Sequence, residues 1–211
     1  MTEKEIKKYK KQKEQMRDLN GNTLSDPQTA INTESLAAIT NDVAGGIYAG
    51  TSDGNLIIGD TSGSLVPNSG VGNLTVPANT FTVGASYHLV CSGDIPQENK
   101  NDQVTLELTA TSGAVVVPLC SVTVDLETSS GESYFELECD FTFRSTGSQA
   151  EILTSCDFTF NKKLEKDFKG TRKVQSSTID STTEQTIGLT CTITGATTQL
   201  LTRLFYLRRQ Y

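Results

Sequence analysis

Residue types on which active sites and metal centres depend are scarce in this chain. Its 211 residues include no tryptophan and one histidine, His88, and its five cysteines form no Cys-x-x-Cys pair. This composition lacks the ligand sets of the usual zinc sites. His88 lies between Tyr87 and Leu89 in a strand-like run, without the partners that acid–base chemistry needs. We therefore expect His88 to be structural.

Long apolar runs and nucleotide-binding motifs are also lacking. No stretch approaches the roughly 20 apolar residues that span a bilayer, and the chain opens with Lys and Glu rather than with a secretory signal. There is no Gly-x-Ser-x-Gly elbow, His-Glu-x-x-His helix or Walker loop, and Gly70-Val71-Gly72 lacks the third glycine of a dinucleotide site. We expect no enzyme activity, no catalytic residues, no cofactor and no metal.

Charge is divided unevenly along the chain. The net charge is -7, yet residues 1–18 carry seven bases and four acids, which leaves +3 there and -10 over the rest. An acidic body binds nucleic acid poorly, whereas a basic arm can contact phosphates or an acidic protein surface. A solvated, partly helical tail is the alternative for this arm.

The segment ahead of the main body differs from it in composition. Residues 1–20 carry a thin apolar stripe that favours a helix. Glycines then recur from Gly45 to Gly72 between short apolar fragments, a pattern typical of hairpin arms and edge strands. We predict a basic N-terminal arm over residues 1–46, made of a helix and a linker, and one β-domain over residues 47–211.

From Leu74 onward, apolar residues alternate with polar ones, which is the pattern of strands with one buried face. The clearest run places five apolar side chains, Phe135 to Phe143, on one face. Further runs occur at 104–108, 122–126, 152–160, 187–193 and 201–211. The last run is apolar on both faces, so we expect it in the centre of a sheet or at an interface. Roughly eight to ten such strands predict an all-β, antiparallel jelly-roll sandwich.

Cysteines are spread widely over the β-domain. They are Cys91, Cys120, Cys139, Cys156 and Cys191. The last three fall in phase with the apolar residues of alternating runs, where a free thiol packs as a small hydrophobic group. Their odd number and spacing predict reduced core cysteines, which suits intracellular assembly rather than secretion.

Two groups of acids could form a site. They are Glu136, Glu138 and Asp140 on one strand face, and Asp94, Glu98 and Asp102 in a loop. Carboxylates so placed can pair for acid–base work or bind calcium, for which the loop is the better candidate. The alternative is a solvated face. Residues 162–173 form a basic loop, either solvated or a docking surface for an acidic neighbour.

Four stretches of the body combine β-patterns with turn residues at set intervals. They are Leu74–Phe81 with Gly84 and Tyr87, Asp140–Gly147, Thr182–Thr190, and Leu204–Leu207. Together they cover roughly residues 50–211 and resemble virion proteins of large DNA viruses and phage fibre heads. The resemblance implies a tumour-necrosis-factor-like jelly roll, usually a trimer, at a particle surface or vertex. The charged arm here replaces the family's usual tail, which favours a capsid component over a long fibre.

On this resemblance, we expect a structural virion protein: a minor capsid, penton-like vertex or spike-base component assembled in the host cytoplasm. Its partners would be further copies, as a homotrimer or homopentamer, and other capsid proteins, with the arm docking to neighbouring subunits. The alternative is a receptor- or glycan-binding fibre or spike head, in which Tyr48, Tyr134 and residues 93–101 carry the binding. We expect neither nucleic acid nor a membrane as a partner. A small enzyme on a β-scaffold is the third hypothesis, for which no site assembles in the sequence.

Overall fold

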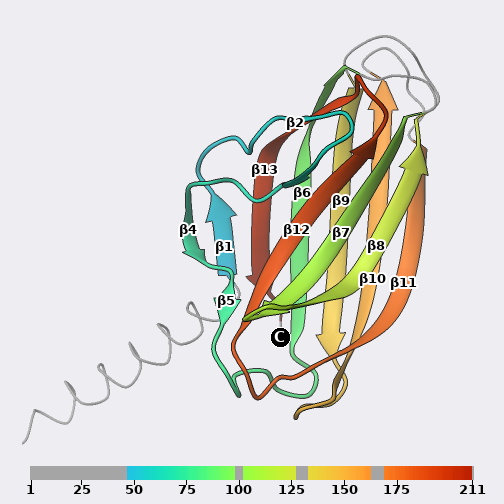
Figure 1. The fold of residues 1–211 in the computed structure, drawn as a ribbon. Helices are drawn as coiled ribbons and strands as arrows, with labels where there is room; N and C mark the ends of the chain where they lie inside the picture. Colours follow the sequence, from blue (N-terminus) through green and yellow to red (C-terminus); the bar gives the residue numbers. More distant parts are fainter. Residues whose placement is uncertain (1–46, 98–101, 127–132, 163–168, 211) are drawn as a thin grey trace, which may run out of the picture. The chain divides into compact units, whose positions relative to one another are not determined.

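The structure, a computed structural model, describes residues 47–97, 102–126, 133–162 and 169–210. Every secondary-structure element in these ranges is a β-strand (Figure 1). The strands are β1 (Ile47–Gly50), β2 (Ile57–Ile58), β3 (Ser62–Ser64), β4 (Gly70–Asn73), β5 (Thr75–Val76), β6 (Ser86–Gln97), β7 (Gln103–Ser112), β8 (Val115–Asp125), β9 (Ser133–Phe143), β10 (Ala150–Lys162), β11 (Lys169–Ile179), β12 (Gln185–Thr194) and β13 (Gln199–Arg209). The predicted arm, residues 1–46, lies outside the described residues.

These strands form two antiparallel sheets packed face to face (Figure 1). The larger sheet has the order β11-β10-β9-β6-β13-β1-β4, with β2 also paired to β13. The smaller sheet has the order β3-β12-β7-β8, with β5 also paired to β12. Two open sheets with one shared core make a β-sandwich.

The order of pairing identifies the sandwich as a jelly roll. β7 pairs with β8, β6 with β9, β3 with β12, and β1 with β13, so each inner pair is nested within the next. A chain folded in this way places its first strand beside its last and forms two Greek keys. β10 and β11 form an added hairpin that extends the larger sheet beyond β9. The predicted all-β antiparallel jelly roll is confirmed.

The core follows the alternation that the sequence shows. On β9 the side chains from Phe135 to Phe143 alternate between buried and outward-facing, and those that face the core are at most 2% exposed. Aromatic rings stack within this core: the centroids of Phe81 and Phe143 lie 4.0 Å apart, and those of Tyr87 and Phe141 lie 5.0 Å apart. Each such contact adds about 0.5–1.5 kcal/mol beyond the burial of the rings.

The last strand, β13, is central in the larger sheet, as its two apolar faces predicted. It lies between β6 and β1. Its Phe205 and Leu207 side chains face the core and are buried, while Leu204 is 47% exposed on the other face. The strand therefore contributes to the core and also places an apolar side chain outside it.

Two of the five cysteines form a disulfide, so the prediction of reduced thiols is wrong for this pair. Cys139 on β9 and Cys156 on β10 face each other directly, with their Cα atoms 4.2 Å apart. Cys91, Cys120 and Cys191 are free and buried, as predicted. Burial raises the pKa of the Cys91 and Cys191 thiols to about 12.

We predict that the number of reactive thiols increases in steps, first on unfolding and then on reduction. At about pH 8, close to the ordinary thiol pKa, the folded protein should resist alkylation because its free thiols are buried. Denaturant without reductant should expose three reactive thiols, and prior reduction should expose all five. Mass spectrometry after alkylation gives the count, and five labelled thiols without reductant would contradict the disulfide.

Candidate functional site

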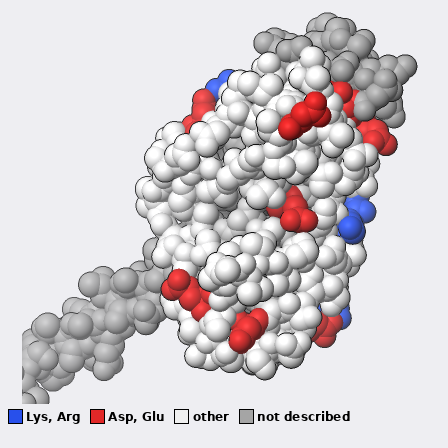
Figure 2. Space-filling view, in the orientation of Figure 1, with Lys and Arg blue, Asp and Glu red and all other residues white. Residues whose placement is uncertain are grey.

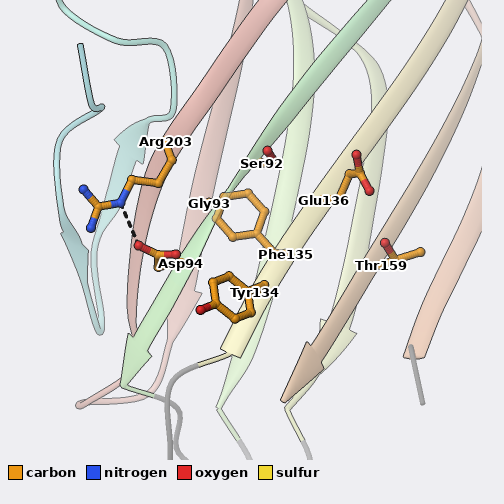
Figure 3. Close-up of a pocket in the computed structure, with 8 residues that line it drawn as sticks. All are labelled: Ser92, Gly93, Asp94, Tyr134, Phe135, Glu136, Thr159 and Arg203. Carbon is orange, nitrogen blue, oxygen red and sulfur yellow. Dashed lines mark hydrogen bonds and ion pairs between the residues drawn. The ribbon is translucent and has the colours of Figure 1, made fainter. Parts of the chain in front are cut away.

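A hollow of about 400 Å³ opens on the outer face of the larger sheet (Figure 3). Residues from four adjacent strands line it. They are Ser92, Gly93 and Asp94 of β6, Tyr134, Phe135 and Glu136 of β9, Thr159 of β10, and Arg203 of β13. The hollow is therefore built on the rigid sheet.

Small residues and a displaced strand create this hollow. β6 contributes Ser92 and Gly93 at this level, and the register of β13 against β6 shifts beside them. A Cβ atom on Gly93 would overlap the backbone oxygen of Leu201 and lie 2.9 Å from Cε1 of Phe135. Glycine therefore allows β13 to pass close to β6 here.

Arg203 is held by two carboxylates at the rim of the hollow. Its Nε donates to Oδ2 of Asp94 over 2.6 Å, and its Nη1 donates to Asp53 (Figure 3 shows the first contact). The hydrogen bonds to Asp94 and then Asp53 raise the pKa of Arg203 above its ordinary value. The guanidinium is therefore already neutralised, and the hollow does not present a bare positive charge.

The hollow also contains one accessible aromatic ring. Tyr134 is 47% exposed and stands beside Glu136 on the same face of β9. Hydroxyl and carboxylate groups around an exposed aromatic ring can bind the polar edges and the apolar face of a polyhydroxylated ligand. Among the lining residues, none pairs a nucleophile with a hydrogen-bonded base, which is the arrangement that covalent catalysis needs.

The loop acids that suggested calcium binding have separate partners. Asp94 lies within strand β6 rather than in a loop, and its carboxylate is bonded to Arg203 at the hollow. Asp102 is buried and accepts hydrogen bonds from the backbone nitrogen of Thr198 over 3.1 Å and from its hydroxyl over 2.7 Å. Glu98 lies outside the described residues. In the described ranges, no three His, Cys, Asp or Glu side chains are grouped as metal ligands.

Tyr134, Tyr48 and His88, the other candidates from the sequence, lie in three different settings. Tyr134 lines the hollow, but Tyr48 donates its hydroxyl to the backbone oxygen of Pro67 over 3.0 Å and packs against Phe205. Tyr48 therefore packs on the body of the protein and is not part of the hollow. His88 lies on β6 with Nδ1 2.8 Å from a carboxylate oxygen of Asp140, so it pairs on the sheet surface.

The predicted acidic strand face is present, but only part of the predicted basic loop is described. Glu136, Glu138 and Asp140 all face outward and are exposed. Residues 163–168 lie outside the described residues. The prediction of a loop is wrong for the described part, because Lys162 ends β10 and residues 169–173 begin β11. Of the predicted residues 93–101, Gly93 and Asp94 line the hollow. Sequence reasoning missed Ser92, Thr159 and Arg203 as lining residues, because only the register of four strands brings them together.

Beside the hollow, three apolar side chains stand among polar ones on the outer face of β13 and β6. Tyr206 lies opposite Val90, and Leu204 lies opposite Ser92. Val90 faces outward and yet is only 3% exposed, whereas Leu204 is 47% exposed. We call Val90, Leu204 and Tyr206 the apolar strip. The guanidinium of Arg208 lies 5.8 Å from the centre of the Tyr206 ring.

The outer face of the smaller sheet differs from that of the larger one. Figure 2 shows this side of the molecule, where scattered acidic groups interrupt a surface that is mostly uncharged. Hydroxyl pairs run across its strands, such as Thr105 with Thr123 at 3.0 Å and Ser62 with Thr192 at 2.7 Å. Such side chains are well hydrated, so this face has less to gain from a partner.

Comparisons with known proteins give no family. No family model matches the chain, and no curated protein matches it. Five solved chains match, among them a GH43 glycoside hydrolase engineered to display both endo-xylanase and exo-arabinofuranosidase activity, and Eiger TNF from S. frugiperda.

Both likenesses are distant. The hydrolase is 12% identical with a TM-score of 0.32, and the match covers 72% of this chain but 36% of the hydrolase. Eiger TNF is 6% identical with a TM-score of 0.30, over 78% of this chain and 91% of that one. At such TM-scores neither carries an argument, so the fold rests on the strand pairing described above.

Within the part of the chain that the structure describes, no helix has the length and apolar character needed to cross a membrane.

We predict that the Gly93→Ala substitution destabilises the fold by about 1–3 kcal/mol, the usual range for overpacking. The added Cβ overlaps the backbone of β13 and can be relieved only by moving that strand. Urea unfolding measures the change. The control is Ser92→Ala, whose side chain faces outward, with an expected change within about 0.5 kcal/mol. Equal stability of the two variants would contradict the close approach.

Proposed function

We propose that this chain is a structural virion protein, a minor capsid, penton-like vertex or spike-base component, which assembles through the outer face of its larger sheet. The observation that supports this most is the apolar strip outside the core, in which Leu204 is 47% exposed, Tyr206 is half-buried and Val90 is covered by its neighbours. Exposed apolar groups rimmed by charged ones are typical of protein interfaces.

Closed rings suit the strip's position on the molecule. The strip lies in the middle of a sheet face, on β13 and β6, so a neighbouring copy can cover it without adding strands to an edge. Copies related by rotation bury such a patch in a closed homo-oligomer. A ring of three would suit a spike or head, and a ring of five would suit a vertex.

The viral setting of the proposal rests on the sequence resemblance of residues 50–211. The Cys139–Cys156 disulfide removes the cysteine-based argument for assembly in a reducing compartment. Assembly in the host cytoplasm therefore stays a prediction.

We expect the purified chain to form a closed oligomer of three or five copies, and the Leu204→Glu substitution to dissociate it. A charge placed at the centre of an apolar contact is costly to bury. The control is Val115→Glu, at a valine on β8 that is 64% exposed against 47% for Leu204, and it should leave the oligomer intact. Mass photometry gives the copy number, and circular dichroism checks the fold. A wild-type chain that stays monomeric and is missing from purified particles would contradict the proposal.

A second candidate function, a receptor- or glycan-binding head, is favoured by the hollow. The observation is the half-exposed Tyr134 ring next to Glu136 and the fixed Arg203–Asp94 pair. Jelly-roll scaffolds carry lectin sites as well as capsid contacts, so the fold permits both.

For this second function, we predict that the assembled oligomer binds on a glycan array and that Tyr134→Ala weakens binding by about tenfold or more, as for other central aromatic contacts. Tyr134→Phe keeps the ring and should retain most of the binding. No array signal from the wild-type oligomer would count against a glycan site.

A further inference from the structure

Three carboxylates stand outward on the exposed face of β9 and β10 without a matching cation. They are Glu136, Glu138 and Asp157, which we call the acidic strip. Glu138 and Asp157 are directly opposite in register, and like charges so placed destabilise a sheet. No ion pair joins any of the three to a Lys or Arg of the described ranges.

Nearby cations do not neutralise the strip. Arg172 lies opposite Asp157 in register, but its Nε donates to the hydroxyl of Ser155 over 3.2 Å. The next acid along β9 is different, because Asp140 meets His88 at 2.8 Å. The fold therefore provides a partner for Asp140. The acidic strip can instead be paired by cations from a segment outside the described residues.

One segment of the same chain has the complementary charge. Residues 1–18 carry a net charge of +3 against -10 for the remainder. Residues 19–46 join this segment to β1, and extended chain covers about 3.3 Å per residue, or roughly 90 Å. Strands β1 and β9 are three positions apart in the larger sheet, or about 14 Å at the usual strand spacing, so the linker is long enough to carry the segment past its own subunit to the strip of an adjacent copy.

We propose that the acidic strip is the docking site for the basic N-terminal segment, residues 1–18, of a second copy of this chain. The proposal rests on the oligomer of the proposed function and names the surface that receives its arm. Lysine ammonium groups of the arm pair with Glu136, Glu138 and Asp157. Each subunit thereby gives one arm and receives another around the ring, beside the contact made by the apolar strip.

The test is zero-length carbodiimide crosslinking of the full-length oligomer, assembled from a one-to-one mixture of ordinary and heavy-isotope-labelled chains. Mass spectrometry should find crosslinks between lysines of residues 1–18 and the acidic strip in peptide pairs of mixed isotope. Their yield should fall as salt is raised, because exposed charge pairs are screened.

Charge reversal sharpens this test. Reversing the strip with Glu136→Lys and Glu138→Lys should lower the mixed-isotope yield about tenfold, the usual scale of losing a charge-complementary contact. Reversing the arm with Lys7→Glu, Lys8→Glu and Lys10→Glu should do the same.

Combining the two reversals should restore the crosslinks with the partners exchanged. The control is Glu107→Lys with Glu184→Lys, which changes the net charge equally on the smaller-sheet side and should leave the yield unchanged. Loss of the crosslinks in this control would overturn the proposal, because net charge rather than the strip would then explain them.

The outcomes separate this inference from the proposed function. Three results would overturn the docking proposal alone while the oligomer stays intact. In the first, every crosslink from the acidic strip joins two peptides of the same isotope. In the second, the strip is crosslinked only to Lys163 and Lys166 of its own chain. In the third, the strip forms no crosslinks. A chain that mass photometry finds monomeric overturns both.

Discussion

The whole structure depends on how its antiparallel strands are paired. The pairs are nested within one another, and the side chains of each strand alternate between the core and the outer face. A strand that slipped by one residue would turn its whole buried set outward. On β12 such a slip would remove Ile187, Leu189, Cys191 and Ile193 from the core, all of which are at most 1% exposed. Because each strand gives one face to the core, its other face is available to serve a function.

The two outer faces that result are different. The smaller sheet presents hydroxyl pairs such as Thr105 with Thr123, which water hydrates well. The larger sheet presents the apolar strip, the acidic strip and the hollow, side by side on β13, β6, β9 and β10. The hollow depends on the fold directly, because its lining residues come from four strands, and the register of β13 against β6 shifts beside Gly93, where the two strands approach closely.

The sequence predicted the fold better than the site, for a physical reason. Alternation along one strand shows which residues face inward, and this was enough for the sandwich and for the central place of β13. It does not show which residues of different strands lie opposite each other. The disulfide was missed for this reason: Phe143 pairs with Ile152, and the same register brings Cys139 to Cys156. The hollow needs the register of four strands at once, so Arg203 could not be placed beside Asp94.

We propose that copies of this chain join through the outer face of the larger sheet. Cryo-electron microscopy of the assembled protein tests it most directly. We expect a closed ring in which Leu204 and Tyr206 are buried between copies, while the face over β12 and β7 remains in solvent. A ring joined through β12 and β7, with Leu204 still exposed, would contradict it.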